Sequence, residues 1–272
     1  MTETPKLTDQ AALALHRARA ARDPVTFLHQ AVADELQERL AEVKKAFTAP
    51  LLVGNVTAPF SEAFPDAPRI PDTPELDVTQ NTQDLVIHLF GLHWADDPVG
   101  QLVQSRLALQ PDGLFLGVMF GGTTLHELRA SLAEAEARLT GGLSPRVLPM
   151  ADLRDLGGLL QRAGFALPVA DSQCFTVRYP SLAKLVQDLR GMGETNALAS
   201  RRRKSATRAL FAETERLYRQ SFEDDGYLTA TFEVVFLTGW APSANQPQPL
   251  RPGSATSRLS DALGVPETPL KR

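Results

Sequence analysis

The amino-acid sequence predicts an α/β fold built around a doubly wound, largely parallel sheet. The prediction rests on three stretches in the middle of the 272 residues. Residues 84–90 form a mostly apolar run, which is typical of a strand buried on both faces. Residues 97–109 place apolar side chains at the spacing of an amphipathic helix, and 114–120 is a second apolar run. Strand, helix and strand over about forty residues form a βαβ unit, which favours parallel strands and a right-handed crossover.

Local signals mark the ends of the elements in this unit. Asp96 and Asp97, followed by Pro98, are the residue types that favour the N-cap and first turn of a helix. The Pro-Asp-Gly sequence at 111–113 turns the chain into the second strand, and the glycine pair at 121–122 ends that strand. The sequence therefore predicts the boundaries of the central unit as well as its elements.

The chain before this unit predicts helices and one short strand. A polar lead and a short helical stretch occupy residues 1–23. A longer helix is predicted from Pro24, with Asp23 as its N-cap, to about residue 49, and residues 51–53 are a short strand.

The segment 54–76 carries five prolines. Proline lacks an N–H and moves the residue before it away from helical angles. We therefore expect an extended or looped connection here, without a helix of more than two turns.

The second half alternates helices and strands and ends in a polar tail. Helices are predicted at 123–139, 152–163, 180–190 and 206–222, with strands at 174–179 and 231–240 and a hairpin-like turn at 223–226. In the first of these helices four leucines share one side: Leu125, Leu128, Leu132 and Leu139. The tail beyond Pro242 is rich in Pro, Ser, Gln and Arg, so we expect it to be disordered or docked as an arm. This divides the chain into N-terminal helices (1–49), an α/β domain (50–241) and a flexible tail (242–272).

Composition limits the class of protein. Hydrophobic residues make up 43% and charged residues 22%, which suits one α/β domain with appendages or at most two domains. No apolar run is long enough to span a membrane, and the N-terminus lacks a secretory signal. The net charge of −4 gives no reason to expect a nucleic-acid partner. The single cysteine, Cys174, excludes a disulfide framework, and we expect it to be buried.

A cytoplasmic setting is the default expectation. Residues 11–22 are rich in arginine and amphipathic, as in a mitochondrial presequence. Asp9 and Asp23 flank them, however, and a plain surface helix explains the pattern equally well.

Seven motifs resemble a known family when taken together. They are DLVIHLFGLHWADDP (84–98), LQPDGLFLGVMFGGTTLHELR (109–129), GGLSPRV (141–147), LRDLGGLLQRAGF (153–165), VRYPSLAKLVQDLRGMGETNA (177–197), ATFEVVFLTGWA (230–241) and RPGSA (251–255). In this order they resemble the class I methyltransferase-fold proteins related to the mitochondrial complex I assembly factor described as an arginine hydroxylase. They are more distantly similar to the biotin-pathway malonyl-carrier-protein methyltransferases. The resemblance implies a Rossmann-like class I methyltransferase fold with a helical N-terminus.

The resemblance also implies a cofactor, S-adenosylmethionine, at the carboxyl ends of the strands. Gly54 matches one glycine of the cofactor loop, and Asp72 falls at the acidic position on the adenine side. Only 72 − 54 = 18 residues separate the two, whereas a helix and two strands need roughly twice as many, since one βαβ unit takes about thirty. We therefore expect a fold truncated in the region of its second and third strands, with impaired cofactor binding. His93 and Trp94 follow a strand, where such sheets place ligands, and are either site residues or packing residues.

By the same resemblance, the expected partner is a protein, namely an arginine-bearing loop of a complex I subunit. Glu194 and Asn196 lie on a glycine-flanked loop; they either bind the substrate or cap the next helix. The carboxylate of Glu194 suits a guanidinium. The sequence leaves three hypotheses: an assembly protein that acts on an arginine, an active methyltransferase with an atypical cofactor loop, and a non-catalytic paralogue that scaffolds a partner. It does not settle whether the chain is an enzyme.

Two further groups of residues favour structural roles. His88, His93 and Asp96 include the residue types of a non-haem iron site, but they divide between a strand and a loop, so core or cap roles are expected and no metal site is predicted. The basic run 201–204 either contacts an acidic partner or is a solvated helix start, of which the second is the more common.

Overall fold

The computed structural model describes residues 6–246 and 264. The chain divides into two compact units, 1–242 and 243–272. The first unit carries the helices and strands, which follow one another as α1 (Gln10–Ala20), α2 (Phe27–Glu42), β1 (Pro50–Gly54), α3 (Ala58–Ala63), β2 (Arg69–Ile70), β3 (Gln83–Leu89), η1 (Leu92–Trp94), α4 (Pro98–Ala108), β4 (Leu109–Phe120), α5 (His126–Thr140), α6 (Leu153–Arg162), β5 (Ala166–Tyr179), α7 (Leu182–Met192), α8 (Arg208–Phe222), β6 (Glu223–Asp224) and β7 (Tyr227–Trp240).

These strands form one mixed sheet of seven strands. Its order is β2-β1-β3-β4-β7-β5, and the short β6 pairs with β7. Neighbours from β2 to β4 run parallel, whereas β7 runs antiparallel to both β4 and β5. The predicted βαβ unit is confirmed, because β3 and β4 pair in parallel with α4 between them in the chain. The fold is α/β and Rossmann-like.

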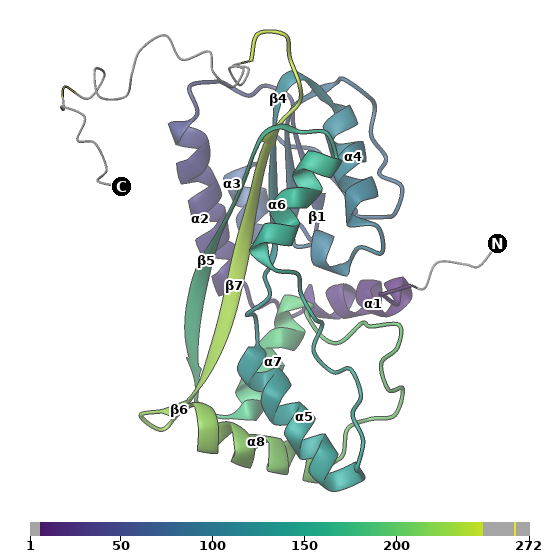
Figure 1. The fold of residues 1–272 in the computed structure, drawn as a ribbon, viewed down its shortest axis with the longest axis vertical. Coiled ribbons are helices and arrows are strands. Elements are labelled where there is room, and N and C mark those ends of the chain that lie inside the picture. The colour runs from purple at the N-terminus through teal and green to yellow at the C-terminus, as the bar shows by residue number, and fades with distance from the viewer. Residues whose placement is uncertain (1–5, 247–263, 265–272) are drawn as a thin grey trace, which may run out of the picture. The chain divides into compact units, whose positions relative to one another are not determined.

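Helices cover both faces of this sheet, as a doubly wound fold requires. Along β3, Leu85 and Ile87 belong to one buried cluster and Val86 belongs to the other, because successive side chains of a strand point to opposite faces. Figure 1 shows α2 and α3 on one side of the sheet and α4 and α6 on the other.

The carboxyl ends of the parallel strands face a second group of helices. Since β4 runs antiparallel to β7, its last residue, Phe120, pairs with Val234, near the middle of β7. The long β5 and β7 extend beyond the other strands there, and α5, α7 and α8 gather around them (Figure 1). Helix α1 packs against α7 at the same end.

Helix α2 is shorter at both ends than the sequence predicts. It begins at Phe27 with Thr26 as its N-cap, so the predicted cap at Asp23 is wrong. The N–H of Val25 donates to the carbonyl oxygen of Gly191 at 3.0 Å, which holds the preceding residues against α7 instead of in the helix. The helix ends at Glu42. Phe47, predicted to extend its apolar stripe, lies beyond that end but packs against the same core cluster as Phe64.

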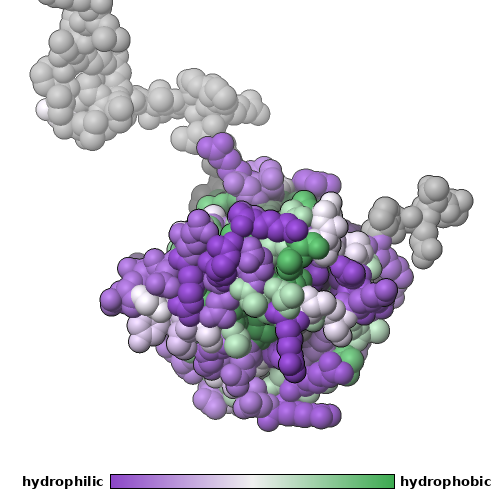
Figure 2. Space-filling model, turned by 90° about the horizontal axis from the view of Figure 1, so that it is seen from below, coloured by the Kyte–Doolittle hydropathy of each residue, from purple (hydrophilic) through white to green (hydrophobic). Residues whose placement is uncertain are grey.

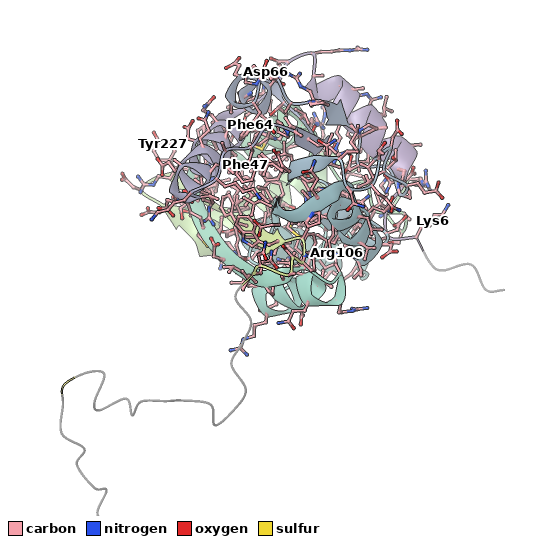
Figure 3. The ribbon with its side chains drawn as sticks, turned by 90° about the horizontal axis from the view of Figure 1, so that it is seen from above. Lys6, Phe47, Phe64, Asp66, Arg106 and Tyr227 are labelled. Carbon is pink, nitrogen blue, oxygen red and sulfur yellow. The ribbon has the colours of Figure 1, made fainter. Side chains whose placement is uncertain are left out.

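Figure 3 views the molecule from above. Phe47 and Phe64 lie inward of Asp66 in this view, and both pack against the same buried core cluster. The proline-rich segment contains α3, of six residues, and β2, of two. No helix of more than two turns forms, as predicted, but the expectation of a wholly irregular connection is wrong.

Three further expectations are corrected or lie outside the description. Cys174 is exposed, because β5 is the edge strand of the sheet. Leu139 is 48% exposed near the end of α5, although Leu128 and Leu132 of the same stripe are buried. Most of the tail, 247–263 and 265–272, lies outside the described residues, as does the motif at 251–255.

Within the described part of the chain, no helix combines the length and the apolar character that crossing a bilayer requires.

Candidate functional site

An ion pair lies at the carboxyl ends of β2 and β3. Arg17, on α1, places Nη1 2.6 Å from Oδ1 of Asp72, and its Nη2 donates to the carbonyl oxygen of Phe90 at 3.0 Å. The side chains of Arg17 and Asp72 are only 16% and 10% exposed. Asp72 follows β2 by two residues, so the sequence prediction that it lies at this edge is consistent with its position.

The carboxylate of Asp72 is committed to this contact. Burial alone would raise its pKa, but the charge of Arg17 and the hydrogen bond from Arg17 outweigh burial and lower the pKa overall. A Cβ built on Gly91 would lie 2.4 Å from Asp72 Oδ2, so glycine is needed there for the carboxylate to fit. Asp72 is therefore charged, buried and held from two sides.

Gly54 ends β1 with φ of +107°. A Cβ at this position would lie 2.4 Å from the carbonyl oxygen of Leu89, which itself accepts the N–H of Asn55 at 2.9 Å. The close approach of β1 to β3 therefore accounts for a glycine at position 54, and no ligand is needed to explain it.

His88 lies beneath Asp72 in the core. It is fully buried, and its Nε2 lies 3.0 Å from Oε1 of Gln101, while Nε2 of Gln101 donates to the carbonyl oxygens of Asp72 and Thr73. Because the amide nitrogen of Gln101 is already donating, we assign the histidine Nε2 as the donor to Oε1. Burial lowers the pKa of His88 to about 4, so it is neutral at pH 7.

Glu194 forms a second buried polar group on the other side of Arg17. Its Oε2 accepts from the indole Nε1 of Trp94 at 2.8 Å and lies 3.2 Å from Nε2 of His93. Its Oε1 is buried and has no hydrogen-bond partner among the described residues. Burial would raise the pKa of Glu194, but the charge and hydrogen bond of His93, the charge of Arg17 and the bond from Trp94 lower it overall.

The end of α7 positions this carboxylate. Gly193 adopts φ of +82°, and the N–H groups of Gly193 and Glu194 bond to the carbonyl oxygens of Arg190 and Leu189. This is the Schellman arrangement, which satisfies the last carbonyls of a helix and redirects the chain. The loop therefore turns Glu194 inward, against the carboxyl end of the sheet.

Glu194 lines a cavity of about 200 Å³ between the sheet and the lower helices. Aromatic side chains from four elements contribute to its wall: Trp94, Phe120, Phe211 and Phe232. Arg146 also lines it; its Nη2 is paired with Glu136 at 2.6 Å, and its buried Nε has no hydrogen-bond partner among the described residues. The cavity is thus apolar, with one carboxylate oxygen that lacks a partner. Such a site suits a cationic group with an apolar stem.

The remaining predicted residues have other partners. Asn196 lines the same cavity, but its amide nitrogen donates to the carbonyl oxygen of Pro145 and its oxygen accepts the N–H of Leu198. Asp96 accepts the N–H groups of Leu7 and Thr8. Among the described residues, no three His, Cys, Asp or Glu side chains are grouped as metal ligands.

Two residues of this region were not singled out from the sequence. Arg17 lies on a helix that reads as an ordinary surface helix, and nothing in its local pattern indicates a partner 55 positions away. His29 is 2% exposed on α2, where its ring meets Phe60 and Phe90 at centroid distances of 5.8 and 5.2 Å. The apolar stripe of α2 places position 29 next to Leu28, but the stripe does not predict a buried histidine.

Sequence comparisons identify relatives of this chain. The arginine-hydroxylase NDUFAF5, mitochondrial, of Rattus norvegicus is 38% identical over 206 residues, which are 75% of this chain and 60% of that protein. The malonyl-[acyl-carrier protein] O-methyltransferase of Xylella fastidiosa is 34% identical over 64% of this chain and 57% of that protein. The matches thus span about three fifths of the length of these curated relatives, and they confirm the resemblance predicted from the motifs. No family model matches the chain.

Among solved structures, the YcgJ protein of Bacillus subtilis matches with a TM-score of 0.49 at 12% identity, over 78% of this chain and 98% of that one.

Proposed function

This chain is a homologue of the NDUFAF5 arginine hydroxylases and, more distantly, of malonyl-[acyl-carrier protein] O-methyltransferases, and we propose that it recognises an arginine-bearing protein segment without using S-adenosylmethionine. The observation that carries the proposal is the free oxygen of Glu194 at the wall of an apolar cavity. The proposed loss of the cofactor is supported by Arg17 of α1, which is paired with Asp72.

The proposal that the chain recognises an arginine rests on the chemistry of Glu194. A guanidinium is planar, presents several donors and stacks on aromatic rings, so a buried carboxylate among aromatic side chains suits it better than a neutral group. The two existing bonds use Oε2 and leave Oε1 for an incoming donor. The predicted substrate residues Glu194 and Asn196 therefore have different roles: Glu194 binds the cation, and Asn196 holds the rim of the cavity through Pro145.

The proposal that the chain does not use S-adenosylmethionine rests on Asp72 and on the short segment before it. The resemblance implies that Asp72 lies on the adenine side of S-adenosylmethionine, but here Arg17 is paired with Oδ1 of Asp72 and donates to the carbonyl oxygen of Phe90. Strand β2 has two residues and pairs directly with β1, so no other strand lies between them. These residues do not fit the cofactor. We propose that the fold is truncated here and that cofactor binding is lost.

A peptide with capped termini and one central arginine tests the proposed recognition of arginine. Calorimetric titration of the full chain should give saturable binding, and replacement of the arginine by citrulline should weaken it about tenfold or more, because citrulline keeps the shape and loses the charge. Glu194→Gln should abolish the preference for arginine, whereas Glu134→Gln, at an exposed carboxylate on α5, should leave it unchanged. Equal binding of the two peptides to the natural chain would overturn the proposal.

The relationship to NDUFAF5 also supports the proposal of a partner in complex I assembly. Affinity purification of the tagged chain from its own cells should recover a complex I subunit, and Glu194→Gln should reduce the recovery. Mass spectrometry of the recovered subunit shows whether its arginine is modified. Loss of every complex I subunit from the eluate, together with normal complex I in a deletion strain, would contradict this assignment and leave the chain as a scaffold for another partner.

A further inference from the structure

A groove between α7 and α8 adjoins the cavity that holds Glu194. It has a volume of about 280 Å³ and is lined by Leu182, Ala183 and Val186 of α7 and by Phe211 and Ala212 of α8. Phe211 is 37% exposed, which is unusual for a side chain of its size. Figure 2, seen from below, shows hydrophobic residues in the middle of this end of the molecule with hydrophilic residues around them.

The groove and the cavity share part of their walls. Val186 and Phe211 line both hollows, so an extended segment with one side chain in the cavity would place a neighbouring side chain in the groove. In an extended segment, neighbouring positions lie about 3.3 Å apart along the chain, so the reach is one or a few residues. The two hollows therefore form one continuous surface.

Charged side chains from both hollows contribute to this surface. Glu194 lines the cavity, and its buried Oε1 has no hydrogen-bond partner among the described residues. At the groove stands Arg190, which is exposed near the end of α7. The other charged wall residue, Glu215, is already paired with Arg219 at 3.0 Å. A complementary ligand thus carries a cation for the cavity, an apolar side chain for the groove and an anion for Arg190.

We propose that the α7–α8 groove binds the residues next to the arginine of the partner segment, selecting an apolar neighbour and a nearby acidic residue. This inference rests on the proposed recognition of arginine by Glu194 and adds the sequence context of that arginine. The occupant is a protein segment in an extended conformation. It contributes its guanidinium to the cavity, an aliphatic or aromatic side chain to the groove and a carboxylate to the guanidinium of Arg190.

Three blocked peptides and two variants test the inference on the full chain by calorimetry. The first peptide carries arginine, leucine and glutamate in that order; the second replaces leucine with serine; the third replaces arginine with citrulline. We expect the serine peptide to bind about tenfold more weakly than the leucine peptide. Ala183→Gln places a polar side chain in the groove at an exposed helical position that does not line the cavity, and should remove this difference.

Charge reversal tests the anionic position. Arg190→Glu should weaken the leucine peptide several-fold, whereas Arg154→Glu, at an exposed arginine on α6, should not. If serine and leucine peptides bind equally and neither Ala183→Gln nor Arg190→Glu has an effect, the groove is not used and this inference is overturned. If the citrulline peptide binds as well as the other two, the recognition of arginine by Glu194 itself has failed. The two failures are therefore distinguishable.

Discussion

Single residues at the carboxyl ends of the strands determine what this protein can bind. Arg17 forms an ion pair with one buried carboxylate, Asp72, and its charge also lowers the pKa of a second, Glu194. Asp72 forms the ion pair, whereas Glu194 keeps one oxygen without a partner. A buried carboxylate with an incomplete set of hydrogen bonds is costly, and a cationic ligand would recover that cost on binding. This difference between the two carboxylates is the basis of the proposed function.

The Arg17–Asp72 pair should show strong coupling in a double-mutant cycle. Arg17→Met leaves a buried charge on Asp72, and we expect a loss of about 3 kcal/mol in the free energy of unfolding. Arg17→Met with Asp72→Leu should lose much less, since both charges are then absent. Urea denaturation of the two single variants and the double variant measures this. Additive losses would mean that the pair does not form.

Buried histidines should make the chain less stable in mild acid. Burial lowers the pKa of His29 to about 4 from an ordinary value of 6.5, partly opposed by the charge of Glu194. The unfolded chain therefore binds a proton that the folded chain excludes between these values. The contribution of His29 to the free energy of unfolding should be fully present above pH 6.5 and should decrease as the pH falls toward 4. The total loss from His29 is on the order of 3 kcal/mol.

His29→Leu should flatten this dependence without abolishing it, because burial also lowers the pKa of His88 to about 4. Thermal unfolding at several pH values checks the slope. His126→Gln, at a half-exposed histidine, is the control and should leave the slope unchanged. An unchanged slope in His29→Leu would show that this histidine is not excluded from protonation.

At the scale of elements, α1 and the end of α7 act together. Asp9, the N-cap of α1, accepts from Arg201 at 2.9 Å, and Thr8 pairs with Leu198 in a β-bridge. Gly193 allows the two helices to approach, because a Cβ there would lie 3.2 Å from Cγ of Arg17. The position of Glu194 and the closure over Asp72 thus depend on the same helix contact.

Gly193→Ala should weaken this contact. The left-handed conformation costs a non-glycine residue about 1–2 kcal/mol, and the new methyl group also presses on Arg17. Gly158→Ala is a matched control inside α6, where a Cβ would meet nothing within 4 Å. That change should stabilise by about 1 kcal/mol. Denaturant midpoints and hydrogen exchange of the α1 amides measure the effects of the two variants. If the α1 amides of Gly193→Ala exchange as slowly as those of the natural chain, the predicted role of this glycine is contradicted.

At the scale of the whole molecule, the sequence predicts elements better than contacts between them. The N-cap Asp97 lies where the sequence predicts it, and α5 and α6 end at Thr140 and Arg162, each within one residue of the predicted ends at 139 and 163. These signals are strong because they depend on neighbouring residues alone. The start of α2 was missed because a hydrogen bond to Gly191, far along the chain, holds Val25 outside the helix.

The candidate site was predictable only in part, for the same reason. The positions of His93, Trp94 and Glu194 followed from the resemblance, and the structure brings them into contact. Arg17 could not be found from its own helix, because its partners come from β2 and β3. The exposure of Cys174 depended on β5 lying at the edge of the sheet, which strand patterns do not reveal.

The most direct test of the account is one calorimetric experiment on the full chain with two titrants. S-adenosylmethionine, at up to millimolar concentration, should give no saturable heat, because Arg17 holds Asp72 and fills the space beside it. The arginine-bearing peptide should then bind with the same affinity whether or not the cofactor is present. Saturable binding of S-adenosylmethionine in the micromolar range, or a peptide affinity that depends on it, would contradict the account and favour an active methyltransferase with an atypical cofactor loop.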